Sequence, residues 1–278
     1  MNDNSDSNKE SEGRVEGTIK AVAGLAKEVP IYPDAIQPVA KETGKALETV
    51  GKAVNVALLP IKGLVWGADK IEAFVKTKVT AKLKNTPEEN IQSPDLTVAG
   101  PALESLRYTG HNESLSDLYA NLLATSMDSR TAEIAHPSFV EIIRNMNSDE
   151  ARVIKYLIEN NNQPIIDIYR DMPSENISYT VCRNASIVGK LAGCKNYHSI
   201  SSYFDNLIRL GLIEILMRSL ADSDIYNQIL DDEDIIKIIK EINDIDGARL
   251  GTKRGVVRIT DLGGLFAEAC VIEKTTSP

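Results

Sequence analysis

The order of apolar and polar positions predicts a chain built mainly from amphipathic helices. Over residues 15–29 and 34–59, apolar side chains recur at helical spacing and so share one face of each predicted helix. Pro30, Pro33 and Pro60 end or kink these helices, because proline lacks a backbone donor. Another helix is expected over residues 68–84, with lysines near its end, where cations interact favourably with the helix dipole.

A second group of helices is predicted after residues 85–101, whose Pro, Glu, Asn and Ser content is typical of a loop. Helices are expected over residues 102–108, 113–126 and 136–146. The middle one carries a continuous apolar stripe, typical of a bundle core, made by Leu115, Leu118, Tyr119, Leu122 and Leu123. We therefore interpret residues 14–146 as one helical region.

The pattern changes character after residue 147. Helices are predicted over residues 148–160, 164–172 and 200–210, and a strand over 211–216 after Gly211, whose lack of a side chain suits the end of a helix. Residues 256–260 are expected to pair with that strand as a small β-hairpin, and a closing helix over 261–272 follows. The fold class is thus mainly α, with a winged-helix-like domain at residues 147–278.

Charge is distributed unevenly over the chain, whose net charge is -9. Residues 14–84 hold twelve Lys or Arg against seven Asp or Glu, whereas residues 85–278 hold eighteen against twenty-nine. Residues 221–246 form an acidic insertion with nine acidic side chains against two lysines. A basic segment joined to an acidic body is typical either of an arm that seeks a charged surface or of a helix that docks on the body.

The composition favours the cytoplasm. Residues 1–13 are polar and acidic, unlike a secretory signal, and we interpret them as a disordered tail. Cys182, Cys194 and Cys270 are odd in number and lack the spacing of a disulfide framework. The uncharged stretch at residues 53–61 falls short of the roughly 20 apolar residues of a membrane-spanning helix.

Three segments carry a family resemblance: LYANLLATSM at residues 118–127, AHPSFVEII at 135–143 and NSDEARVI at 147–154. They resemble the abortive infection alpha family of bacterial phage-defence proteins. The similarity extends to AVNVALLPIKG at 53–63, NLIRLGLI at 206–213 and ITDLGG at 259–264. The resemblance implies growth arrest or death of a phage-infected cell, and it carries no established catalytic residues.

Candidate chemistry is sparse. A zinc site from Cys182, Cys194 and His198 would lack both a fourth ligand and the short Cys-x-x-Cys spacing of structural sites. Glu133, His136 and Glu141 could gather near one helix start, but capping or packing explains them better. No Gly-x-Ser-x-Gly nucleophile motif or phosphate-binding loop is present. We therefore expect no cofactor, no metal and no enzyme activity.

Two binding surfaces are candidates. A winged-helix regulator would use Arg249, Lys253, Arg254 and Arg258 near the wing to contact DNA, although the acidic insertion would repel phosphate. The basic helices could instead lie on an anionic membrane or bind a protein partner. The residues for that contact are Lys41, Lys45, Lys52, Leu58, Leu59 and Trp66. Burial of the same apolar stripe in a bundle core is the competing interpretation.

The function that these observations favour is phage-triggered abortive infection through a regulated protein-protein or membrane interaction. In this hypothesis the basic region is held against the acidic body until a phage cue frees it, and the partner is another protein, a second copy of the chain or the inner membrane surface. The alternatives are a DNA-binding transcriptional regulator and, third, a hydrolase or nuclease.

Overall fold

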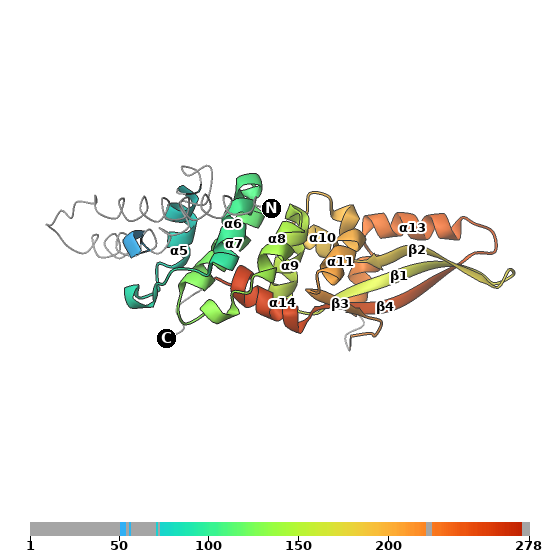
Figure 1. The fold of residues 1–278 in the computed structure, drawn as a ribbon. Helices are drawn as coiled ribbons and strands as arrows, with labels where there is room; N and C mark the ends of the chain where they lie inside the picture. The colour runs from blue at the N-terminus through green and yellow to red at the C-terminus, as the bar shows by residue number, and fades with distance from the viewer. Residues whose placement is uncertain (1–50, 54–55, 57–70, 72, 221–223, 274–278) are drawn as a thin grey trace, which may run out of the picture. The chain divides into compact units, whose positions relative to one another are not determined.

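The computed structural model describes residues 51–53, 56, 71, 73–220 and 224–273, which belong to one compact unit, Gly44–Pro278. Helices and one four-stranded antiparallel sheet make up this part of the chain (Figure 1). Our predictions for residues 1–50, including the tail at 1–13, lie outside the described residues. The fold is mainly α, as predicted.

The described part of the predicted 68–84 helix is helical. It contains a π-helical turn, η1 (Val75–Val79), that continues directly into α5 (Thr80–Lys82). Val75, Val79 and Leu83 are buried, because they fall on the side that faces the helices downstream. A short 3-10 turn, η2 (Glu88–Asn90), follows in the connecting loop.

The loop predicted over residues 85–101 is shorter than expected. Helix α6 (Leu96–Thr109) begins before Pro101, and Asp95 caps it by accepting a hydrogen bond from the Thr97 backbone at 2.8 Å. Proline removes one helical hydrogen bond. Buried Val98 and Ala102 on either side of it keep the helix against the core, so packing outweighs that loss.

The predicted bundle helices are present. Helix α7 (Glu113–Met127) runs through the centre of the core, with Tyr119 fully buried. A 3-10 turn, η3 (Ala132–Ile134), leads to α8 (Ser138–Arg144). Helix α9 (Ser148–Asn160) starts with a capping box in which Asn147 and Glu150 satisfy each other's backbone donors.

The four strands are β1 (Gln163–Met172), β2 (Ile177–Ala185), β3 (Ile213–Leu216) and β4 (Arg249–Ile259). They pair antiparallel in the order β2-β1-β4-β3. The pairing of the two predicted hairpin strands is confirmed, with Ile213 opposite Ile259.

The prediction of a helix over residues 164–172 was wrong, because this segment is strand β1. Ile165 faces one hydrophobic cluster, whereas Ile166 and Ile168 belong to another on the opposite face of the sheet. A strand buried on both faces loses the alternation of apolar and polar positions by which strands are recognised. Strand β2, which pairs with β1 as a hairpin, was not predicted either.

Between α9 and the predicted 200–210 helix, the structure has a short helix, α10 (Val188–Leu191), in place of the predicted 164–172 helix. It is followed by η4 (Tyr197–Ser199) and α11 (Ile200–Arg209), which matches the predicted 200–210 helix. The closing helix is also present, as α14 (Asp261–Phe266) and the π-helical turn η6 (Ala267–Val271). Phe266 meets Phe139 of α8 edge to face, at 5.5 Å between ring centroids.

The acidic insertion folds onto the sheet. It comprises η5 (Asp224–Tyr226), α12 (Asn227–Leu230) and α13 (Glu233–Asn243). Tyr226 is buried with Ile166 and Ile168, and its hydroxyl donates to the carbonyl of Gly255 at 3.1 Å. Figure 1 shows α13 lying along the sheet near β2.

One large hydrophobic cluster crosses residue 146, where we placed a domain boundary. It includes Val79, Leu122 and Phe139 before that position and Ile154 and Phe266 after it. The helical region and the sheet-containing region therefore share a core.

Candidate functional site

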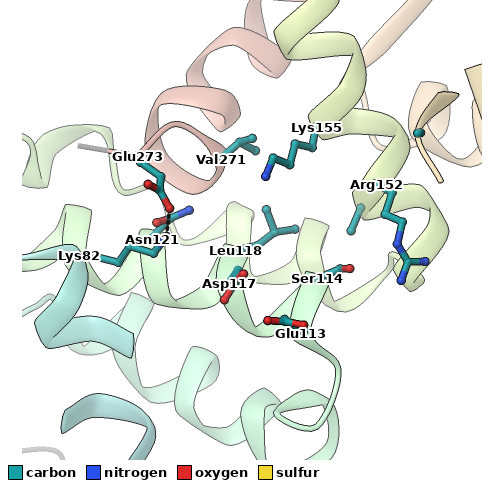
Figure 2. Close-up of a pocket in the computed structure, with 12 residues that line it drawn as sticks. Lys82, Glu113, Ser114, Asp117, Leu118, Asn121, Arg152, Lys155, Val271 and Glu273 are labelled. Atoms are coloured by element: carbon teal, nitrogen blue, oxygen red, sulfur yellow. Dashed lines mark hydrogen bonds and ion pairs between the residues drawn. The ribbon is translucent and has the colours of Figure 1, made fainter. Parts of the chain in front are cut away.

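A charged cavity of about 420 Å³ lies among α5, α7, α9 and η6 (Figure 2). Its lining consists of Lys82, Glu113, Ser114, Asp117, Leu118, Asn121, Ala151, Arg152, Lys155, Ala192, Val271 and Glu273. Three of these side chains are basic and three are acidic, so the cavity is close to neutral overall but strongly polar. Leu118, Val271 and the two alanines are the apolar residues of the lining.

Helix α7 supplies the acidic wall. Glu113, Asp117 and Asn121 are four residues apart and so lie above one another on the same face of the helix. Asn112 caps the helix, and its amide also donates to the hydroxyl of Ser148, the first residue of α9. That contact fixes the starts of the two walls relative to each other.

Helix α9 supplies the basic wall. Arg152 and Lys155 are three residues apart and line the cavity from the side opposite the acidic wall, with Lys155 extending toward it and the Arg152 guanidinium turned away (Figure 2). Lys155 is exposed and lies 3.9 Å from Glu159 one turn further along, a weak surface pair. Its ammonium therefore stays available to the cavity.

Asp149 holds Arg152 in place. This buried carboxylate accepts hydrogen bonds from the backbone amides of Lys195 and Asn196 at 3.0 and 2.9 Å and from the Tyr203 hydroxyl at 3.1 Å. The Arg152 guanidinium lies 2.5 Å from it. Burial raises the pKa of Asp149, but these hydrogen bonds lower the pKa more, so the group stays ionised.

Two ion pairs attach the helical segment before residue 84 to the rest of the molecule. The Lys78 ammonium lies 2.6 Å from Asp117 of α7 and 2.9 Å from the Ser116 hydroxyl. The Lys82 ammonium lies 2.7 Å from Glu273, just beyond η6, and lowers the pKa of that carboxyl. We call Lys78–Asp117 and Lys82–Glu273 the tether pairs.

The position of Glu273 depends on two buried side chains of α7. The Asn121 amide donates to the carbonyl of Cys270 at 2.9 Å, and the Thr125 hydroxyl donates to the carbonyl of Ala269 at 3.0 Å. Both carbonyls belong to η6, whose π-helical geometry disturbs the usual bonding ladder. Helix α7 thus supplies both the acidic wall and the support for the chain end that carries Glu273.

The residues predicted to meet a membrane or partner fall mostly outside the described part. Lys41, Lys45, Leu58, Leu59 and Trp66 are not described, and Lys52 is exposed. Among the described residues, none of the helices is long and apolar enough to cross a bilayer.

The four residues predicted as wing contacts lie on β4 but are used differently. Arg249 and Lys253 are exposed. Arg254 covers the ring of Tyr226 at 4.9 Å, and Arg258 pairs with Glu214 at 2.6 Å. Two of the four are therefore engaged within the molecule.

The metal candidates are not brought together. No group of three or more His, Cys, Asp or Glu side chains is placed to hold a metal within the described ranges. His198 lies 3.8 Å from Asp234, and the His136 ring accepts from the Ser138 backbone at the start of α8.

Sequence reasoning did not find this cavity. Lys78 and Lys82 were explained by the helix dipole alone, and Asp117 and Glu273 were not singled out. The sequence did contain a signal. Glu113 and Asp117 lie four residues apart on one predicted helix, and Lys78 and Lys82 lie four residues apart on another, so each pair shares one helix face.

Comparison with known proteins decides the family. The model of the abortive infection alpha family matches residues 67–270. The chain belongs to the abortive infection alpha family. The predicted resemblance is thereby confirmed over most of the chain, and the match supports a role of the abortive infection type in general. The AVNVALLPIKG segment at residues 53–63 lies outside the matched range.

The other comparisons add little. The chain resembles the solved structure of an uncharacterized protein from the hydrocarbon-degrading marine bacterium Alcanivorax borkumensis SK2, with 20% identity and a TM-score of 0.34. The similarity covers 50% of this chain and 94% of that one. None of the curated proteins matches the chain.

Proposed function

We propose that this abortive infection alpha protein acts through a regulated interaction rather than through catalysis. In the resting state, its basic helical region is held on the acidic body at the tether pairs, and a phage cue releases it to bind a partner. The observation that carries this proposal is that Lys78 and Lys82 contact Asp117 and Glu273, which come from two segments far apart in the chain.

The energetics suit a latch. Glu273 is 73% exposed and Lys82 19%, so water screens their attraction. Exposed ion pairs of this kind contribute about 0.2–1 kcal/mol each. Buried Val79 and Leu83 anchor the end of the segment in the core. The tether pairs are therefore weak enough to be exchanged for a competing charged surface, while the segment stays attached.

The sheet-containing region supports protein contact over DNA binding. Strands β1, β4 and β3 with α9, α10 and α11 follow the order of a winged helix, and we propose that this region derives from one, with β2 added. Helix α11 would be its recognition helix. Its exposed Asp205 pairs with Arg183 at 3.3 Å, and Arg209 donates to Asn206 of the same helix. An acidic side chain on that face would repel phosphate.

Charge reversal at the acidic members of the tether pairs tests the proposal. With Asp117→Lys and Glu273→Lys together, expression in uninfected cells should slow growth, because like charges then face Lys78 and Lys82. The matched control is Asp205→Lys, which reverses an exposed acid remote from the cavity lining. Growth equal to that of wild type in both strains would contradict the latch.

A further inference from the structure

Lys155 is the least committed basic side chain of the cavity. The Arg152 guanidinium is held by a buried carboxylate and turned away, and the Lys82 ammonium lies 2.7 Å from Glu273. Lys155 has a weak surface pair at 3.9 Å, and Figure 2 shows its side chain directed into the cavity. One cation of the basic wall can therefore hold an anionic ligand.

Glu273 lies among several ammonium groups at the same end of the cavity. The hydrogen bond from Lys82 does most to lower the pKa of Glu273, and the charges of Lys155 and Lys84 lower the pKa further. Among the described residues, Lys82 is the one ammonium within ion-pair distance of this carboxylate. Glu273 carries a single charge and is 73% exposed, so it neutralises the lysines incompletely and can be displaced.

We propose that the cavity binds a small phosphate monoester, whose phosphate takes the place of the Glu273 carboxylate between Lys82 and Lys155. A phosphate monoester carries up to about two negative charges and offers three acceptor oxygens, so it can contact both ammonium groups at once. The cavity volume of about 420 Å³ suits a molecule of this size.

The acidic wall selects the rest of the ligand. Glu113 and Ser114 begin α7, two turns before Asn121, and their side-chain oxygens accept hydrogen bonds from hydroxyl groups. Asp117 is already neutralised by Lys78 at 2.6 Å. A second phosphate would be repelled by Glu113, whereas hydroxyl groups suit this wall. The ligand class that fits both ends is a sugar phosphate.

Binding of the ligand would remove one tether pair, because the phosphate replaces Glu273 at Lys82. This consequence rests on the proposed latch, whereas the binding itself does not. Binding is measured on the purified protein and the latch in growing cells. A ligand that binds would keep the site even if the growth test contradicted the latch, and absence of binding would leave the latch standing.

Isothermal titration calorimetry of the full chain with ribose 5-phosphate tests the site. Ribose 5-phosphate should bind and ribose should not. Lys155→Met should weaken binding about tenfold, because one of two charge-assisted contacts is lost. The matched control is Lys240→Met, which removes an exposed ammonium of α13 outside the cavity lining and should change nothing.

Three results of this titration would overturn the proposal. They are absence of ribose 5-phosphate binding at millimolar concentrations, equal binding of ribose, and binding that Lys155→Met leaves unchanged. Binding of the protein to phosphatidylglycerol vesicles without binding of ribose 5-phosphate would also overturn it, in favour of a lipid surface.

A second variant tests whether the ligand displaces Glu273. Glu273→Gln should tighten binding of ribose 5-phosphate about threefold, because an exposed competing ion pair no longer has to be broken. Glu241→Gln is the control, since it removes an exposed carboxylate of α13 outside the lining and should leave the affinity unchanged. Unchanged or weaker binding by the Glu273→Gln variant would show that the phosphate does not take the place of Glu273.

Discussion

The Lys82 ammonium lies 2.7 Å from the Glu273 carboxylate and so joins two segments that are 191 residues apart in the chain. Both residues line the charged cavity, as does Asp117, which pairs with Lys78. Its effect on the protein should be conformational rather than a large gain in stability.

The first prediction concerns the strength of that contact. A double-mutant cycle with Lys82→Met and Glu273→Gln should give a coupling below about 1 kcal/mol, because Glu273 is largely exposed. The lowered pKa of Glu273 means that its contribution is present above the ordinary carboxyl pKa of about 4 and is lost as pH falls through the lower folded value. Urea unfolding at low and high salt measures the coupling, and persistence in high salt would contradict a screened pair.

The second prediction concerns Asp149. Asp149→Asn should destabilise the protein by about 3 kcal/mol, because a buried carboxylate loses its charge-assisted hydrogen bonds to Lys195, Asn196 and Tyr203. Its lowered pKa places the acid loss of this stability below the ordinary carboxyl range. Urea unfolding tests this value against Asp205→Asn, which removes an exposed pair and should cost under about 1 kcal/mol. Equal losses would show that Asp149 is not a structural centre.

The third prediction concerns two neighbouring glycines of α14. A methyl group at Gly263 would collide with the carbonyl oxygen of Leu212, whereas one at Gly264 would meet no atom within 4 Å. Gly263→Ala should therefore destabilise by at least about 2 kcal/mol. Gly264→Ala should be neutral or stabilise by up to about 1 kcal/mol, since alanine favours helix. Thermal unfolding distinguishes them, and similar melting temperatures would contradict the packing of α14 on Leu212.

The fourth prediction concerns thiol reactivity. Burial raises the pKa of Cys194 to about 11 and raises that of fully buried Cys270 well above the ordinary thiol value, so neither is a thiolate near neutral pH. Cys182 is only half-buried, although its pKa is also raised. Labelling of the native protein by iodoacetamide should be slow, with Cys182 first and Cys270 last. Faster labelling of Cys270 would contradict its place in the core.

Local sequence pattern identified the helices whose apolar side chains recur at helical spacing. Leu115, Leu118 and Leu122 make α7 recognisable. The start of α9 was placed correctly at Ser148, although its cap is Asn147 rather than Ser148. Strand β1 was misassigned because Ile165 and Ile166 are buried against different clusters, which erases the alternation of a strand.

The cavity depends on contacts that local pattern does not encode. Glu273 reaches Lys82 only because Asn121 and Thr125 hold the carbonyls of η6. Those side chains look like ordinary helix residues in the sequence. Their role follows from the packing of the chain end on α7, which no periodicity within a single segment reveals.

The swap of charges across the tether pairs tests the latch most directly. The measurement compares the growth of uninfected cells that express D117K/E273K with those that express K78E/K82E/D117K/E273K, at matched protein levels. The latch predicts slowed growth for the first variant and normal growth for the second, because the second rebuilds both pairs with opposite polarity. Normal growth of the first variant, or slowed growth of both, would contradict the account.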